Sequence, residues 1–101
     1  MAELVFSTQA GTKRRPVMVV YDSGDEDLLV VPITSQAGRT KYDIPVVEWQ
    51  EAGLRLASVV RTEKLATVAK TTVIRKLGHL SAKDWLIAQA ALEQLLRAIL
   101  A

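Results

Sequence analysis

Three short polar clusters in this 101-residue chain combine side chains that suit phosphate chemistry. The first is the basic run Lys13-Arg14-Arg15, which stands directly before Pro16 and a β-branched stretch. Arginine offers planar, paired N–H donors that match a phosphoryl group, and the start of a strand holds such a side chain on a rigid element. The run therefore predicts a phosphate-binding group that stabilises developing charge. A solvated basic turn is the alternative.

The second cluster, Thr34-Ser35-Gln36, presents two hydroxyls and an amide at the end of a predicted strand. Hydroxyls in such places serve local turns more often than substrates. The third cluster, Arg61-Thr62-Glu63, follows apolar residues, and strand alternation places Arg61 and Glu63 on one face. Glu63 would then hold Arg61, or one group would move a proton while the other stabilises an oxyanion. An exposed ion pair is the alternative.

The remaining composition narrows the chemistry further. There is no cysteine and one histidine, His79. These counts exclude, within one chain, disulfide scaffolds, zinc ribbons, thiol nucleophiles and acid–base pairs of two histidines. We expect His79 on the rim or surface of a strand and outside a catalytic site. Trp49 is the better of the two tryptophans for stacking on a base, although core packing is the more usual role.

The overall balance of residues is typical of one folded module. Hydrophobic residues make up 50% of the chain and charged residues 24%, and the length allows one domain, residues 1–101. The net charge of +2 is too small to establish nucleic-acid binding, but the charges are segregated into basic residues 13–15 and acidic residues 22–27. Because no segment resembles a membrane span or a signal peptide, we expect a soluble cytoplasmic protein without a membrane partner.

Short strands are predicted to position the polar clusters. Residues 16–22 and 28–33 are rich in β-branched side chains, and the turn-forming residues between them predict a hairpin. A polar loop is expected over Ser7 to Arg14. Five or six short strands predict a small, strongly curved antiparallel barrel or sheet. Further extended pieces are predicted at 4–6, 42–47, 56–61, 72–74 and 76–80, and one helical turn at 48–52.

A helix is predicted from Ser81 to the C-terminus. Ser81 is the expected N-cap, and Asp84 occupies the capping-box position three residues later. Apolar residues recur at spacings of three and four and form a stripe that should face the sheet. The stripe consists of Trp85, Ala88, Leu92, Leu95, Leu96 and Ile99.

Taken in order, four stretches of the chain resemble the MazF/PemK (Kid-like) toxins of type II toxin–antitoxin modules. They are residues 6–20, then 31–35, then 49–54 with 58–65, and finally 77–81 with the helix that follows. The resemblance implies a mainly β fold with a C-terminal α-helix, namely a small SH3-like antiparallel barrel, and a homodimer. It implies a sequence-specific endoribonuclease, or mRNA interferase, that inhibits translation and growth. Such enzymes need no metal or cofactor, because the ribose 2′-OH attacks and leaves a 2′,3′-cyclic phosphate and a 5′-OH.

The resemblance also implies roles for individual residues. Arg15 would contact the scissile phosphate and assist proton transfer, and Thr34 would orient the substrate or stabilise the oxyanion. Arg61 matches a general acid, and Glu63 stands where Kid-like members have Asp, as the partner base. Candidate contacts to the RNA backbone are Lys13, Arg14, Ser35, Gln36 and Arg39.

The implied partners are single-stranded mRNA and a cognate antitoxin whose disordered acidic tail would occupy the RNA groove. Family chains usually begin with Gly-Asp and a full strand before the segment that matches Phe6, so the first strand is expected to be shortened here. Two other functions remain open. One is an inactive module that binds RNA or the antitoxin, and the other is a CcdB-like inhibitor of DNA gyrase.

Overall fold

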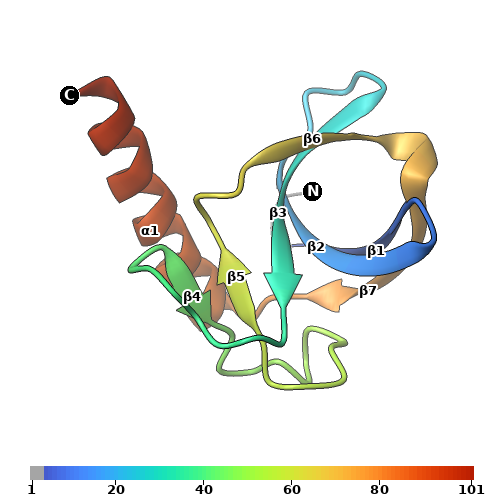
Figure 1. The fold of residues 1–101 in the computed structure, drawn as a ribbon, viewed down its shortest axis with the longest axis horizontal. Coiled ribbons are helices and arrows are strands. Elements are labelled where there is room, and N and C mark those ends of the chain that lie inside the picture. Colours follow the sequence, from blue (N-terminus) through green and yellow to red (C-terminus); the bar gives the residue numbers. More distant parts are fainter. Residues whose placement is uncertain (1–3) are drawn as a thin grey trace.

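The computed structural model describes residues 4–101, which form a curled antiparallel sheet and a C-terminal helix (Figure 1). The strands follow in the order β4-β5-β3-β2-β1-β7, and β6 pairs with the first half of β3. The elements are β1 (Leu4–Ala10), β2 (Lys13–Tyr21), β3 (Asp27–Thr34), β4 (Asp43–Pro45), β5 (Val59–Arg61), β6 (Ala66–Ala69), the 3-10 helix η1 (Lys70–Thr72), β7 (Val73–His79) and α1 (Ala82–Leu100).

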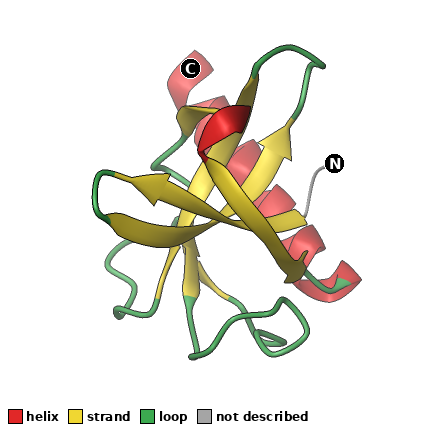
Figure 2. Cartoon of the chain, turned by 90° about the vertical axis from the view of Figure 1, so that its right-hand side faces the viewer, coloured by secondary structure: helices red, strands yellow, loops and turns green. Residues whose placement is uncertain are grey.

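Strands β2 and β3 form the centre of this sheet, as their runs of β-branched residues predict. The sheet curls on both sides of these two strands and forms an open barrel. The 3-10 helix η1 joins β6 to β7 on the side of the barrel away from α1 (Figures 1 and 2). Helix α1 covers one side of this open barrel, next to β4 and β5. The mainly β fold and small antiparallel barrel expected from the sequence are therefore confirmed.

Two hydrophobic cores lie on opposite faces of the central strands. Alternation along β2 sends Met18 into the first core and Val17 and Val19 into the second. The first core lies between the sheet and α1 and includes Val5, Val31, Val60, Ala88 and Leu92. The second is enclosed by the barrel strands and includes Leu28 and Val30 with the partly buried Leu4, Phe6, Val68 and Val73. Burial on both faces holds the register of β2 and β3, because a slip by one residue would exchange the two cores.

The polar loop expected over Ser7 to Arg14 is wrong. Strand β1 continues to Ala10, a turn at Gly11 follows, and β2 begins at Lys13. Polar residues can form a strand here because β1 pairs with a neighbouring strand on each side. The hydroxyl of buried Thr8 donates a hydrogen bond to the Arg15 carbonyl oxygen over 3.3 Å. The residues that precede Leu4, where the sequence predicts a shortened start, lie outside the described residues.

Two smaller expectations are also corrected. Strand β6 is not predicted from the sequence, and the pieces expected at 72–74 and 76–80 form one strand, β7, with η1 before it. The single turn expected at 48–52 is present, and in it the Ala52 N–H donates to the Glu48 carbonyl oxygen over 3.4 Å.

Helix α1 begins where the sequence predicts. The Ser81 hydroxyl accepts a hydrogen bond from the Asp84 N–H over 3.1 Å, as an N-cap should. The apolar stripe faces the sheet only in the first half of the helix, since Leu96 and Ile99 are 49% and 63% exposed. The last turns extend past the sheet (Figure 1). Within residues 4–101, no helix is long and apolar enough to cross a membrane.

Candidate functional site

An open groove of about 470 Å³ lies where β2 begins and β3 ends. Four arginines line it: Arg14 and Arg15 from β2, Arg55 from the loop between β4 and β5, and Arg75 from β7. Within residues 4–101, no Asp or Glu lines this arginine groove. Uncompensated guanidinium groups around one hollow attract an anion with several acceptor oxygens, such as a phosphodiester.

Strand pairing places Arg15 next to Thr34. The β2–β3 register pairs Val17 with Pro32, and continued by two residues it brings Arg15 opposite Thr34. Directly opposed residues on neighbouring strands point to the same face of the sheet. Both side chains also line the arginine groove.

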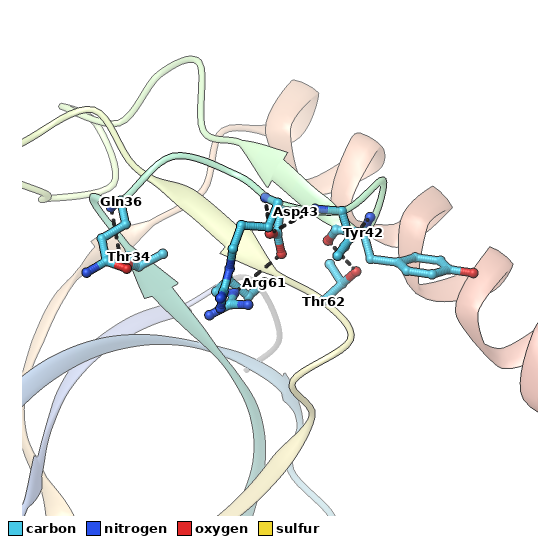
Figure 3. Close-up of polar contacts among 8 residues, drawn as sticks. Thr34, Gln36, Tyr42, Asp43, Arg61 and Thr62 are labelled. Atoms are coloured by element: carbon cyan, nitrogen blue, oxygen red, sulfur yellow. Dashed lines mark hydrogen bonds and ion pairs between the residues drawn. The ribbon is translucent and has the colours of Figure 1, made fainter.

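Arg61 approaches the same place from the other side of β3. The β3–β5 register pairs Thr34 with Val59, so Arg61 is the diagonal neighbour of Thr34 on the same face. Diagonal neighbours are about 7 to 8 Å apart, within reach of a long side chain. Figure 3 shows Thr34 and Arg61 on their adjacent strands. Strands β2, β3 and β5 therefore bring Arg15, Thr34 and Arg61 to one face, although Arg61 is not part of the groove lining.

The side chain of Arg61 is held by Asp43, its partner across the β4–β5 pair. Arg61 Nε lies 3.5 Å from Asp43 Oδ1, and the two side chains are 17% and 1% exposed (Figure 3). Asp43 Oδ2 accepts hydrogen bonds from the backbone N–H groups of Arg39 and Thr40 over 2.8 and 3.3 Å. The carboxylate is therefore fixed by the backbone before it meets the guanidinium.

Hydrogen bonding keeps this buried carboxylate ionised. The Arg39 N–H contributes most to lowering the pKa of Asp43, burial opposes it, and the Thr40 N–H and the Arg61 charge lower the pKa further. Asp43 is thus an anion that holds Arg61 in place. The sequence signal that could have revealed it is an aspartate inside an extended segment, where this residue type is unfavourable without a specific partner.

The expectation that Glu63 shares a strand face with Arg61 is wrong. Strand β5 ends at Arg61, and the chain turns there, with the Lys64 N–H donating to the Arg61 carbonyl oxygen over 3.1 Å. Glu63 is exposed in this turn, while the buried Thr62 hydroxyl donates to the Tyr42 carbonyl oxygen over 2.7 Å (Figure 3). The role of Glu63 as a base stays a prediction.

In the second polar cluster, Thr34 accepts a local hydrogen bond and Ser35 lines the groove. Thr34 Oγ1 accepts a hydrogen bond from the Gln36 N–H over 3.2 Å, which is the local turn use that the sequence also allows (Figure 3). Ser35 lines the groove, whereas Gln36 and Arg39 are exposed outside its lining. Lys13 is likewise exposed outside it.

Two further arginines of the groove, Arg55 and Arg75, are not predicted as site residues from the sequence. Arg75 stands two positions before Leu77 on β7, and both line the groove. This alternation was the available signal, but the strand was expected in two pieces. His79 is exposed on β7 as predicted, and the partly buried Trp49 packs against the first core, the more usual role that the sequence allows it. Within residues 4–101, no group of three or more His, Asp or Glu side chains is arranged to hold a metal ion.

A curled antiparallel sheet, a C-terminal helix and an arginine-lined groove define a small barrel protein with one strongly basic face. The sequence matches the family of PemK-like, MazF-like toxins of type II toxin–antitoxin systems over residues 3–96. The chain therefore belongs to this toxin family, and the resemblance noted from its residues is confirmed. A comparison with curated protein sequences gives no match.

Solved structures share the fold at low sequence identity. The Mycobacterium tuberculosis toxin MazF-mt6 is 22% identical with a TM-score of 0.80, over 93% of this chain and 96% of the other. A mycobacterial endoribonuclease in complex with its cognate antitoxin is 17% identical with a TM-score of 0.79, over 95% and 93%. MazE–MazF from Deinococcus radiodurans is 17% identical with a TM-score of 0.79, over 94% and 92%.

Proposed function

We propose that this toxin is a metal-independent endoribonuclease that cleaves single-stranded mRNA in the cytoplasm and so stops translation and growth. The observation that carries the proposal is the meeting of Arg15, Thr34 and Arg61 on one face of three neighbouring strands, beside a groove lined by arginines. A charge-dense face with a hydroxyl suits a phosphodiester in which negative charge increases during reaction.

In the proposed reaction the nucleophile is part of the substrate. The ribose 2′-oxygen attacks the adjacent phosphorus, and the bond from phosphorus to the 5′-oxygen breaks. The 2′-hydroxyl proton goes to a base, for which Glu63 is the candidate. Arg61, as the general acid, gives a proton to the departing 5′-oxygen and takes one back from solvent afterwards. Arg15 and Thr34 bind the phosphoryl oxygens. The products are a 2′,3′-cyclic phosphate and a 5′-OH, so no metal-bound water is needed.

The proposal includes a cognate antitoxin whose acidic tail occupies the arginine groove. Two observations support it: the groove lining is basic and without carboxylates among residues 4–101, and related toxins from mycobacteria and Deinococcus radiodurans have been solved with antitoxins. Acidic disordered tails bind such surfaces and fold as they do so.

We also propose that the toxin is a homodimer. Leu96, Ile99 and Leu100 on the last turns of α1 are 49%, 63% and 82% exposed, which is unusual for large apolar side chains gathered at one end of a helix. Covering them with a second copy would remove this surface from water.

The test is to incubate the purified wild-type protein and Arg61→Ala with a long mixed-sequence single-stranded RNA in EDTA, and to map the ends. We expect cuts by the wild type with cyclic phosphate and 5′-OH ends, and none by Arg61→Ala. Lys76→Ala is the matched control, because Lys76 is an exposed cation on β7, outside the groove lining and away from the last turns of α1.

Unchanged cutting by a folded Arg61→Ala protein would refute the site assignment. Salt-dependent retention of RNA without new ends would favour the inactive binding module instead. Inhibition of DNA gyrase without RNA cleavage would favour the CcdB-like alternative.

A further inference from the structure

The arginine groove continues onto the face of the sheet opposite Arg15. The β1–β2 register places Pro16 opposite Ser7, and the β1–β7 register places Ser7 opposite Arg75. These side chains therefore form a row on one face, joined by Arg14, which stands two positions before Pro16 on β2. Arg15, one position away, points to the other face with Thr34.

Arg14 and Arg75 thus lie on either side of Ser7. Two strand spacings separate β2 from β7, which amounts to about 10 Å between their backbones. The Ser7 hydroxyl lies between the two guanidinium-bearing strands, and Arg55 joins the same groove from the loop before β5. Three cationic side chains and a hydroxyl donor therefore line a part of the groove away from the face of Arg15, Thr34 and Arg61.

These arginines have no protein counter-charge. The ion pairs within residues 4–101 are Arg61 with Asp43, Lys70 with Asp22, and Arg97 with Glu93. None involves a groove arginine, so three or four like charges gather around one hollow. Such clustering raises the local positive potential and is relieved when an anion binds.

A strand irregularity adds to the case for Arg75. The β1–β7 register shifts between Ser7 and Thr8, because Ser7 faces Arg75 while Thr8 faces Val73. The extra residue, Ile74, is a bulge, and bulges commonly redirect a neighbouring side chain beside a functional site. An arginine next to a bulge at a groove edge is placed to meet a ligand.

We propose that Arg14, Arg55 and Arg75, around Ser7, form a second phosphate subsite that binds the backbone of single-stranded nucleic acid at a phosphodiester other than the one cleaved. The inference rests on the proposed function, and it adds the part of the surface that holds the strand beyond the reacting phosphate. Because the subsite contacts only phosphate groups, it binds RNA and DNA strands alike.

The test measures binding of a short mixed-sequence single-stranded DNA, which carries the phosphates but lacks the 2′-OH and is not cleaved. Affinity is measured by fluorescence anisotropy over a series of salt concentrations for the wild type, Arg75→Ala, Arg75→Lys and Lys76→Ala. Lys76 is the matched control: it follows Arg75 on β7, pairs with Phe6 and is not part of the groove lining.

We expect Arg75→Ala to weaken binding and to reduce the slope of log K against log salt by about 0.7, the value for one phosphate contact on a single strand. Arg75→Lys should keep the slope, because it keeps the charge, and Lys76→Ala should bind as the wild type does. In RNA cleavage Arg75→Ala should raise KM, and Lys76→Ala should leave KM unchanged.

The subsite is refuted if the wild type shows no salt-dependent binding, or if Arg75→Ala and Lys76→Ala give the same slope. Because the DNA strand tests binding without cleavage, a reduced slope in a protein that cuts no RNA supports the subsite and refutes the endoribonuclease. Cleavage with an unchanged Arg75→Ala slope and KM refutes the subsite alone.

Discussion

The buried carboxylate of Asp43 determines where Arg61 lies. Backbone N–H groups of Arg39 and Thr40 hold Oδ2, and Arg61 Nε lies 3.5 Å from Oδ1. Within residues 4–101, neither buried Oδ1 nor buried Nε has a hydrogen-bond partner, so each depends on the ion pair for compensation. A buried charge that loses its partner is strongly destabilising, and this restricts Arg61 to one position beside Thr34.

Asp43 should make the protein less stable in acid. The folded-state pKa of Asp43 lies below the ordinary value of 3.8 that applies after unfolding. Between the two, the unfolded chain binds more protons, so the free energy of unfolding falls as pH decreases through this window, and above it the contribution is complete. Asp43→Asn should therefore show a shallower loss of stability below pH 3.8 in urea unfolding.

Asp22 provides an internal reference for that experiment. Its pKa is also lowered, mainly by a hydrogen bond from Lys70, so its acid sensitivity is present in both proteins. Equal pH slopes for wild type and Asp43→Asn would contradict the role given to Asp43.

Single residues differ in how far the sequence could reveal them. Thr34 and Arg61 are the last residues of β3 and β5, close to the strand ends that the apolar pattern predicts. The same pattern predicts Arg15 directly before a strand, whereas Arg15 is the third residue of β2. Asp43 and Arg75 could not be found in this way, because strand register determines which acid meets Arg61 and which arginine meets Ser7. Glu63 was misplaced because β5 is only three residues long and turns directly after Arg61.

Among the elements, the loop between β4 and β5 forms one wall of the arginine groove. Its start is held by Asp84 of α1, whose carboxylate accepts hydrogen bonds from the N–H groups of Val47 and Glu48 over 3.1 and 2.9 Å. Asp84 therefore ties the helix to the loop instead of closing a capping box. Further along, Gly53 has a φ of +79°, and a Cβ there would overlap the Leu77 carbonyl of β7.

Gly53→Ala should destabilise the fold and disturb the groove. The left-handed backbone costs an alanine about 1 to 2 kcal/mol, and the overlap with Leu77 adds to that cost. Gly11→Ala is the matched control, because Gly11 has a φ of +62° with nothing within 4 Å of its Cβ position. In urea unfolding, Gly53→Ala should lose more stability than Gly11→Ala. An equal loss would show that the contact with β7 does not hold the loop.

The elements that the sequence predicts best are those with a long apolar pattern. Strand β3, most of β2 and the start of α1 are where the sequence places them, because β-branched runs and a serine N-cap are local signals, but β2 begins at Lys13 and not at Pro16. The end of β1 and all of β6 were missed, since polar residues there become strands only by pairing with neighbours. The apolar stripe of α1 is exposed in the last turns of the helix, because α1 extends beyond the sheet there.

The two ends of β2 carry opposite charge. Arg14 and Arg15 stand at its start beside the groove, and the acidic residues 22–27 follow its end. Asp22 in that acidic turn binds Lys70 over 3.0 Å, so part of the remaining positive charge is neutralised there. Although the net charge is only +2, the uneven distribution of charge gives the groove a positive potential that directs anions to it.

The most direct test of RNA cleavage by 2′-hydroxyl attack compares two RNA oligonucleotides that contain the mapped cleavage sequence. One of them carries a single 2′-deoxy nucleotide at the position of the attacking hydroxyl. Both are incubated with the wild-type protein in EDTA. We expect the all-ribose strand to be cut to a 2′,3′-cyclic phosphate and a 5′-OH, and the deoxy strand to bind with similar affinity and stay intact. Cleavage of both strands at that position, or of neither by folded protein, would contradict 2′-hydroxyl attack.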